Sequence, residues 1–348
     1  MRAVVIREHG GLDVLRLEQV PTPEIGSEDT LVAVKACALN HLDLWMRSGP
    51  PEDIFPWRGK DLPRISGGDV AGVVAEVGRG VSGVRAGDPV VLYPGLYCGA
   101  CEYCRVGEHT MCLRYHILGE HADGGLAEYV RIPAKNLIPI EGDLGFEKAA
   151  AVPVAYTTAW RMLITRAGLR PGEEVLVLGV GGGVACAALQ IAVRVGARVI
   201  AGSASAWKLD RARALGADAT ILTGEEPFST QVLDLTRGRG VDVVVDGLGA
   251  RTWQESIRSL ARGGRLVICG ATTGGRVEID IREIYQRHRM VLGAPMGTQR
   301  ETEIVCGLVW RGEIDPVVDR VLPLDQIAEA HRVLEAREQF GKVVVRCT

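Results

Sequence analysis

The stretch VLVLGVGGGVACAALQIA, residues 175–192, joins an apolar run, a cluster of glycines and a run of small apolar residues at helical spacing. An uninterrupted apolar run is typical of a strand buried on both faces of a sheet. Gly179, Gly181, Gly182 and Gly183 let the backbone approach a pyrophosphate, which binds at the N-terminus of the next helix. Ala185 takes the third small-residue position of the glycine pattern found at dinucleotide sites, where the helix packs closely on the strand. The stretch therefore predicts a dinucleotide site between a strand and a helix.

The residues that follow this stretch continue the alternation of strand and helix and predict a whole domain. Apolar strand-like runs alternate with helical runs through RVIAGS (198–203), WKLDRARALG (207–216), VDVVVDG (241–247) and RMVLGAP (289–295). Such alternation is the mark of a doubly wound parallel sheet, which we place at residues 154–294. Residues 1–153 hold short β-type runs separated by Gly and Pro, and residues 295–348 are expected to return to that first domain. The fold class is α/β, with an inserted Rossmann domain.

Composition narrows the class of protein. The chain of 348 residues exceeds the roughly 250–300 residues at which single cores stop growing, so two domains are expected. A net charge of −3 gives no general basic field to attract nucleic acid, and 5% aromatic residues disfavour a base-stacking surface. No apolar run reaches the roughly 18 residues of a membrane span, and no signal peptide is readable. We expect a cytoplasmic enzyme without nucleic-acid or membrane partners.

Four cysteines crowd into CGACEYCRVGEHTMC, residues 98–112. The gaps of two, two and seven residues suit a loop that offers four thiolates to one tetrahedral zinc ion. Four protein ligands leave no position for water or substrate, so the predicted zinc is structural. An iron–sulfur cluster and four reduced thiols are the alternatives. The predicted ligands are Cys98, Cys101, Cys104 and Cys112.

The second strand of the predicted Rossmann domain indicates which dinucleotide binds. An NAD site has an acidic residue at the end of this strand, where it accepts hydrogen bonds from the ribose. Here the strand ends at Ser203, followed by Ser205 and Lys208. Two hydroxyls and a cation suit a 2′-phosphate, which favours NADP(H) over NAD(H). Lys208 alone is also compatible with a solvated helix residue.

Taken over nearly its whole length, the chain resembles the medium-chain dehydrogenases/reductases. The resemblance rests on VKACALNHLDLWMRSG (34–49), GGDVAGVVAEVG (67–78), AAAVPVAYTTAWRML (149–163) and FGKVVV (340–345), besides the two motifs above. It implies a GroES-like β-rich domain that carries the substrate site. It also implies contacts near the nicotinamide from Asn40, Thr158, Val184, Gly270 and Ala271. For Lys342 it leaves two alternatives, the cofactor phosphates or a surface ion pair.

Zinc alcohol dehydrogenases of this family hold a second, catalytic zinc with three protein ligands. The resemblance places those ligands at Asn40, Gly68 and Val154, and two of these residues have no side-chain donor. We therefore expect no catalytic zinc. Asn40 and its neighbours resemble the quinone oxidoreductase branch, although some members named alcohol dehydrogenases also keep the cysteine loop without the catalytic ligands.

The predicted activity is NADPH-dependent hydride transfer to a quinone or an activated C=C bond, because such acceptors spread the developing charge without a Lewis acid. The alternatives are a zinc-type alcohol or aldehyde dehydrogenase and an NADPH-binding protein without turnover. A zinc-ribbon nucleic-acid module is disfavoured.

The titratable or hydroxylic residues near the expected cleft are the candidate proton donors, and none stands out: Asp43, Asp69, His41 and Tyr156. The aromatic and apolar residues near the expected cleft suggest an apolar acceptor: Trp45, Ile54, Phe55, Trp57 and Tyr97. The apolar segment 289–295 predicts a homodimer or a tetramer built from it.

Overall fold

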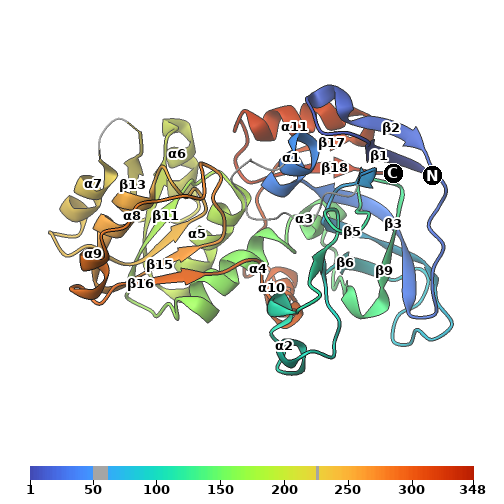
Figure 1. Ribbon diagram of the computed structural model, residues 1–348, viewed down its shortest axis with the longest axis horizontal. Helices are drawn as coiled ribbons and strands as arrows, with labels where there is room; N and C mark the ends of the chain where they lie inside the picture. The colour runs from blue at the N-terminus through green and yellow to red at the C-terminus, as the bar shows by residue number, and fades with distance from the viewer. Residues whose placement is uncertain (50–61, 225–226) are drawn as a thin grey trace. The chain divides into compact units, whose positions relative to one another are not determined.

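A computed structural model describes residues 1–49, 62–224 and 227–348 (Figure 1). The chain forms two compact units, one made of Met1–Thr157 and Thr298–Thr348 and the other of Thr158–Gly297. Ile54, Phe55 and Trp57, which the sequence suggested as acceptor contacts, lie outside the described residues. Among the residues described, none of the helices combines the length and the apolar composition that crossing a bilayer requires.

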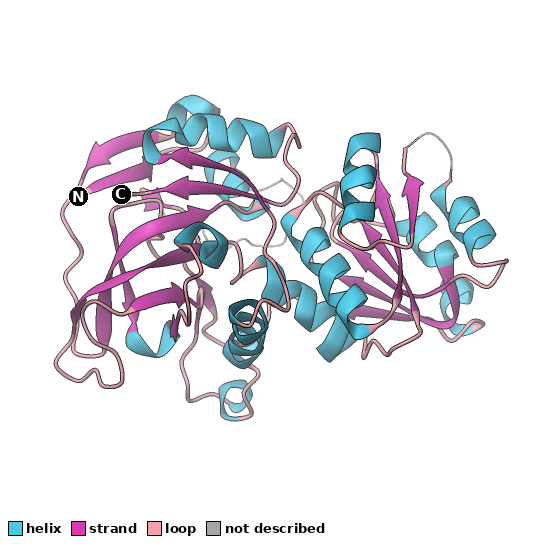
Figure 2. Ribbon diagram, turned by 180° about the vertical axis from the view of Figure 1, so that it is seen from behind, coloured by secondary structure: helices cyan, strands magenta, loops and turns pink. Residues whose placement is uncertain are grey.

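The second unit is an α/β domain built on a six-stranded sheet in the order β13-β12-β11-β14-β15-β16. All neighbouring strands are parallel, and helices lie on both sides of the sheet (Figure 2). This is the strand order of the Rossmann fold, so the predicted doubly wound sheet is confirmed. The strands are β11 (Glu174–Leu178), β12 (Arg198–Ser203), β13 (Ala219–Leu222), β14 (Val241–Asp246), β15 (Leu260–Ile268) and β16 (Met290–Gly293). The helices are α5 (Gly183–Val195), α6 (Ala206–Ala214), α7 (Phe228–Leu235), α8 (Trp253–Ser259) and α9 (Ile281–Tyr285).

Apolar residues and glycines in the sequence explain the central strand and helix of this domain. Val175, Leu176 and Val177 of β11 are fully buried, as a central strand covered on both faces requires. Helix α5 begins after Gly182 and ends at Gly196, whose φ of 86° is the left-handed conformation that glycine adopts at helix ends. Neighbouring strands and helices meet in one apolar core.

The first unit is mainly β. Its largest sheet has the order β10-β6-β5-β3-β18-β17, with β9 also paired to β3. The strands of this sheet are β3 (Asp29–Ala38), β5 (Asp69–Val77), β6 (Pro89–Leu92), β9 (Tyr129–Pro133), β10 (Leu137–Pro139), β17 (Val318–Pro323) and β18 (Lys342–Arg346). The smaller sheets contain β1 (Arg2–Ile6), β2 (Arg16–Gln19), β4 (Arg64–Ile65), β7 (Gly95–Leu96) and β8 (His116–Ile117). The helices are α1 (His41–Ser48), α2 (Glu102–Arg105), α3 (Phe146–Ala150), α10 (Gln299–Trp310) and α11 (Ile327–Glu335). Strands β17 and β18 show that the C-terminal segment completes the sheet begun by the N-terminal one.

Small and apolar residues at helical spacing predict that Glu147–Leu169 is helical around Pro153, but in the structure this helix is interrupted at residues 151–154. Helix α3 ends at Ala150, helix α4 covers Ala155–Trp160, and a π-helical turn covers Arg161–Arg166. Proline has no backbone N–H and disfavours helical geometry in the residue before it, which explains the interruption.

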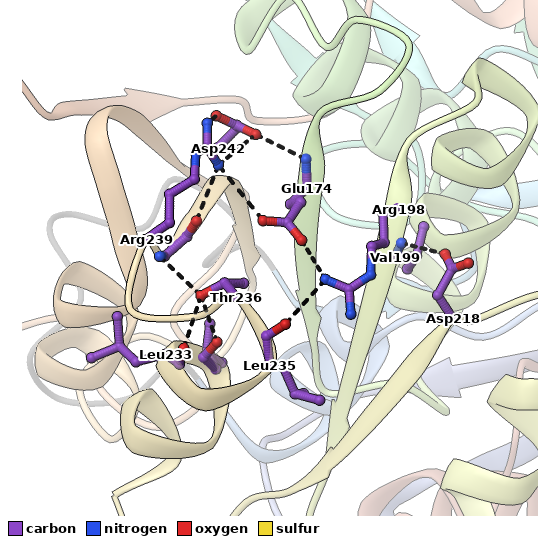
Figure 3. A network of polar contacts seen from close by, with 11 residues as sticks. Glu174, Arg198, Val199, Asp218, Leu233, Leu235, Thr236, Arg239 and Asp242 are labelled. Atoms are coloured by element: carbon purple, nitrogen blue, oxygen red, sulfur yellow. Dashed lines mark hydrogen bonds and ion pairs between the residues drawn. The ribbon is translucent and has the colours of Figure 1, made fainter.

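Charged residues form a polar network at the amino ends of the α/β strands (Figure 3). Glu174 at the start of β11 pairs with Arg198 at the start of β12, and its backbone N–H donates to Asp242 Oδ2 at 2.9 Å. Arg239 donates to Asp242 Oδ1 at 2.6 Å. This network joins β11, β12 and β14 at the edge opposite the glycine turn.

We expect Asp242→Asn to lower the free energy of unfolding by about 1 kcal/mol at pH 7, because Arg239 loses its charged acceptor. Burial raises the pKa of Asp242, but the hydrogen bonds from Arg239 and Glu174 hold it below 3.8 overall. The stabilisation is therefore complete above pH 3.8 and is lost as the pH falls below it. Urea unfolding at pH 7 and pH 3.5 should show a difference between variant and wild type that shrinks in acid. Asp210→Asn, at a 77% exposed carboxylate paired with Arg213, is the control and should change little.

Candidate functional site

A buried cluster of polar side chains lies at one end of the large sheet of the first unit. Strand β3 runs antiparallel to both β5 and β18, and Ala38 at its end pairs with Asp69 on one side and Val344 on the other. The end of β3 therefore lies beside the beginnings of its two neighbours. Asn40, just after β3, meets Asp69, the first residue of β5, and Lys342, the first residue of β18.

Hydrogen bonds tie these three residues together. The Lys342 ammonium donates to Asn40 Oδ1 at 2.6 Å and to Asp69 Oδ2 at 2.8 Å. Asn40 Nδ2 donates to the same Asp69 oxygen at 2.9 Å. The side chains of Asp69 and Lys342 are 0% and 3% exposed, so this is a buried ion pair. Of the two alternatives for Lys342, a surface ion pair is excluded, and its contact in the structure is a carboxylate.

Asp43 braces the turn that carries Asn40. Its carboxylate accepts the backbone N–H of Asn40 at 2.7 Å and that of Gly67 at 2.9 Å. Burial raises the pKa of Asp43 to about 6, although both backbone hydrogen bonds oppose this shift. With both carboxylate oxygens engaged by backbone, Asp43 acts as a support for the Asn40 turn.

The positions that resemble metal ligands in zinc alcohol dehydrogenases offer few donors here. A Cβ added to Gly68 would lie 2.9 Å from the backbone oxygen of Leu118, so a larger side chain requires the chain to move. The backbone N–H of Val154 donates to Asp69 Oδ1 at 2.7 Å. The Asn40 oxygen, the one side-chain oxygen at these three positions, already accepts from the Lys342 ammonium.

The remaining proton-donor candidates have other contacts. The Tyr156 hydroxyl accepts the backbone N–H of Val317 at 2.9 Å and is buried. His41 contacts Trp45 edge to face, with ring centroids 5.2 Å apart. Burial, with a smaller effect of Arg337, lowers the pKa of His41. His41 is thus mainly neutral at neutral pH.

The four cysteines of residues 98–112 come together. Their sulfur atoms all lie within 4.8 Å of one another, and Cys98 and Cys104 are 3.9 Å apart. Four thiolates that each bind a tetrahedral ion at a metal–sulfur distance of about 2.3 Å have similar sulfur–sulfur distances, so the cluster suits a structural metal. The N–H groups of Ala100 and Cys101 donate to Cys98 Sγ and lower the pKa of this thiol to about 5. Burial raises the pKa of Cys104 to about 12, so a bound cation is needed to hold it as a thiolate.

Aromatic stacking fixes the cysteine loop to the first unit. Tyr97 stacks on His109 with ring centroids 4.0 Å apart, and the Lys135 ammonium lies 4.1 Å from the Tyr97 centroid. The Tyr97 hydroxyl donates to Gln299 of α10 at 2.7 Å. Tyr97, suggested by the sequence as an acceptor contact, is engaged in holding this loop.

The glycine turn of the α/β unit has the conformation that a phosphate site requires. Gly179 and Gly181 have φ values of 70° and 110°, which other residues rarely adopt. Gly182 precedes the first residue of α5, Gly183, with Val184 next, so the backbone N–H groups of a helix N-terminus lie at this turn. A Cβ added to Gly181 would lie 2.5 Å from Lys208 Cδ and 3.2 Å from its Nζ. The predicted cation is therefore beside the predicted phosphate turn.

Most of the other predicted cofactor contacts lie at the carboxyl ends of strands in the same sheet, and Thr158 lies on a helix. Ser203 ends β12, and its hydroxyl accepts the N–H of Ser205 at 3.3 Å. Gly270 and Ala271 follow β15 and pack against the Gly247–Gly249 turn after β14. Thr158 lies buried on α4, at the first residue of the α/β unit. Strands β11 and β14 form the point where the strand order reverses, the usual place for a dinucleotide.

Known proteins match both units. Residues 26–142 match the family described as alcohol dehydrogenase GroES-like domain, and residues 183–311 match the zinc-binding dehydrogenase family. The crystal structure of an NAD-dependent alcohol dehydrogenase is 45% identical and covers 100% of both chains with a TM-score of 0.94. An acryloyl-coenzyme A reductase of Sulfurisphaera tokodaii is 31% identical over 99% of this chain and 100% of its own.

A third relative was solved with ligands. The 2-octenoyl-CoA carboxylase reductase CinF, in complex with NADP and 2-octenoyl-CoA, is 29% identical, with a TM-score of 0.88 over 97% of this chain and 82% of that chain. The GroES-like and Rossmann architecture expected from the sequence is confirmed by these matches and by the sheet order. The chain is an oxidoreductase that belongs to the medium-chain dehydrogenase/reductase superfamily, among the zinc-type alcohol dehydrogenases and enoyl reductases.

Proposed function

We propose that this protein is an NADPH-dependent reductase of activated C=C bonds or quinones that works without a catalytic zinc. The observation that supports this best is the buried cluster of Asn40, Asp69 and Lys342. The Lys342 ammonium contacts Asn40, one of the three positions that resemble zinc ligands, and pairs with Asp69. Gly68 and Val154 add no side-chain ligand.

The reduction needs little from the protein beyond alignment and a hydrogen-bond donor. Bound at the turn of Gly181, Gly182 and Gly183, NADPH would supply a hydride to the β-carbon of the acceptor; the C=C electron pair would become an enolate, which a proton from water would convert to the saturated product. The negative charge collects on the acceptor oxygen, where a fixed N–H group stabilises it. Asn40 is the candidate donor, because it is the partly exposed member of its cluster.

The names of relatives support this acceptor class. Acryloyl-coenzyme A and 2-octenoyl-CoA both contain a C=C bond conjugated to a thioester carbonyl. A second candidate function is alcohol dehydrogenation, favoured by the 45% identity to an NAD-dependent alcohol dehydrogenase.

Metal content and substrate range distinguish the two candidates. We expect one zinc per chain and steady NADPH oxidation with enones, enoyl thioesters or quinones. Two zincs per chain, with alcohol oxidation faster than enone reduction, would favour the second candidate. Tight NADPH binding with no turnover across the panel would identify a binding protein.

We also propose that Ser203, Ser205 and Lys208 select NADPH through its 2′-phosphate. Ser203→Asp places a carboxylate at the end of β12, where it repels that phosphate and accepts from a ribose hydroxyl instead. We expect the ratio of kcat/KM for NADPH over NADH to fall at least tenfold. Ser229→Asn, at a buried serine on α7, is the control for general damage to the domain and should leave the ratio unchanged. A wild-type preference for NADH would contradict the assignment.

The partner that we propose is a second copy of this chain. Strand β16 is the edge of the α/β sheet, and Met290 and Val291 on it are 45% and 42% exposed. Ile281 and Tyr285 of α9 are also exposed. An apolar strand edge favours pairing between copies, giving a dimer or a tetramer built from it. Light scattering on Val291→Lys should show a smaller assembly than wild type.

A further inference from the structure

The carboxamide of Asn40 is held in one orientation. An asparagine side chain has an oxygen that only accepts hydrogen bonds and a nitrogen that only donates them. Here Oδ1 accepts from the Lys342 ammonium at 2.6 Å and Nδ2 donates to the Asp69 carboxylate at 2.9 Å. A reversed amide would place N–H groups against the ammonium and the oxygen against the carboxylate. Both contacts would then be lost, so the two charges allow one orientation only.

The supports of this orientation are themselves fixed. Asp69 and Lys342 are almost fully buried and bond to each other at 2.8 Å. The second oxygen of Asp69 accepts the Val154 N–H at 2.7 Å. Hydrogen bonds to charged groups are short and strong. One Nδ2 hydrogen of Asn40 is used by Asp69, and the other has no acceptor among the residues that the structure describes.

We propose that Lys342 is a positioning residue that makes Asn40 a hydrogen-bond donor to the acceptor oxygen. The ammonium holds Oδ1 inside the cluster, and the second amide hydrogen remains for the substrate. This inference rests on the proposed function, in which that oxygen gains negative charge. Removing one such donor typically costs about 100-fold to 1000-fold in kcat.

The orientation can be measured without any substrate. Asn40 and Asn136 are the two asparagines of the chain, so selective ¹⁵N-asparagine labelling gives two side-chain NH₂ signals. Both hydrogens of Asn136 are bonded, to the Tyr93 and Gly95 oxygens, which makes it an internal reference. In wild type we expect one slowly and one rapidly exchanging Asn40 hydrogen. In a Lys342→Met/Asp69→Ser variant, which adds no further asparagine signal, both should exchange rapidly, with Asn136 unchanged. An Asn40 signal that does not change would overturn the proposal.

A second double variant, Lys342→Met/Asp69→Asn, serves for kinetics. Lys342→Met alone leaves Asp69 buried without its partner, which favours unfolding, whereas removing both charges keeps the interior neutral. The amide oxygen introduced at position 69 can still accept the Val154 N–H. We expect kcat to fall about 100-fold, with the KM for NADPH little changed. A rise of about tenfold in the KM for NADPH with kcat retained would instead make Lys342 a phosphate contact.

Matched controls distinguish the positioning role of Lys342 from the proposed function. Arg346→Met removes a cation from the same strand, one that is 58% exposed and pairs with Glu147, and should leave kcat unchanged. A wild-type protein that reduces no enone or quinone refutes the proposed function, and the NMR measurement then decides the positioning role by itself. A kinetic double variant with wild-type kcat refutes the positioning role while the proposed function stands.

Discussion

A Cys104→Ala variant should lose its zinc and the structure of the loop formed by residues 98–112. The variant removes one of four sulfurs that lie within 4.8 Å of one another, and alanine offers no ligand in its place. A structural zinc supplies about 10–16 kcal/mol in zinc-finger peptides. The loop is joined to the rest of the first unit through Tyr97 and His109. Loss of even a third of this free energy would therefore lower the thermal midpoint of unfolding by about 10 °C.

Limited proteolysis and metal analysis measure this effect. Arg105 in the loop and Arg114 just after it are exposed, so trypsin should cleave at both much faster in the variant. Cys306→Ala, at a buried cysteine of α10 outside the cluster, is the control and should keep its zinc and its protection. A Cys104→Ala protein with one zinc and the wild-type cleavage pattern would contradict the assignment. Strong visible absorbance in wild type would point to an iron–sulfur cluster instead.

The α/β unit was the part most open to prediction from sequence. Its strands are apolar on both faces, and its glycine turn has a local signature, so β11 and α5 follow from residues 175–192 alone. The broken helix at Pro153 was missed because the apolar spacing on either side of it is helical, and one missing N–H decides the outcome locally. Local patterns thus predicted the elements but not every interruption.

The cluster around Asn40 was harder to foresee because its members are distant in sequence. Lys342 is 302 positions from Asn40 along the chain, and nothing in FGKVVV indicates a buried lysine. The partner is set by sheet register, since the pairing of β3 with β5 and β18 brings three strand ends together. Asp69 was noted as a candidate acid, yet its role as counter-ion depends on that same pairing. Sequence reasoning found Asn40 and missed what orients it.

His331→Leu should make the protein markedly more resistant to acid. His331 lies on α11 with 0% exposure, and neither ring nitrogen has a hydrogen-bond partner within the described part of the chain. Burial lowers its pKa from 6.5 to about 3, and the charge of nearby Arg47 adds to the shift. Arg47 is itself 3% exposed and pairs with Glu335 at 2.8 Å. Protonating His331 would therefore bury a second positive charge beside the first.

The direction of this pH dependence follows from comparing the pKa of His331 in the folded and unfolded chains. A folded pKa below the unfolded value gives a contribution that is complete above pH 6.5 and is lost as the pH falls from 6.5 toward 3. Each pH unit in that window costs about 1.4 kcal/mol, so roughly 3 kcal/mol is lost by about pH 4.5. Leucine does not titrate and is of similar size, so His331→Leu should match wild type within about 1 kcal/mol at about pH 8. Between about pH 8 and about pH 4.5, the unfolding free energy of the variant should therefore fall about 3 kcal/mol less than that of wild type.

Urea unfolding at the two pH values tests this, because every other group titrates alike in both proteins. His288→Asn is the matched control: His288 is exposed and has a φ of 53°, a conformation that asparagine tolerates. It should leave the pH dependence unchanged. Equal acid sensitivity in His331→Leu and wild type would mean that an internal water or a local opening solvates His331. In that case the packing of α11 over Arg47 would be looser than its burial indicates.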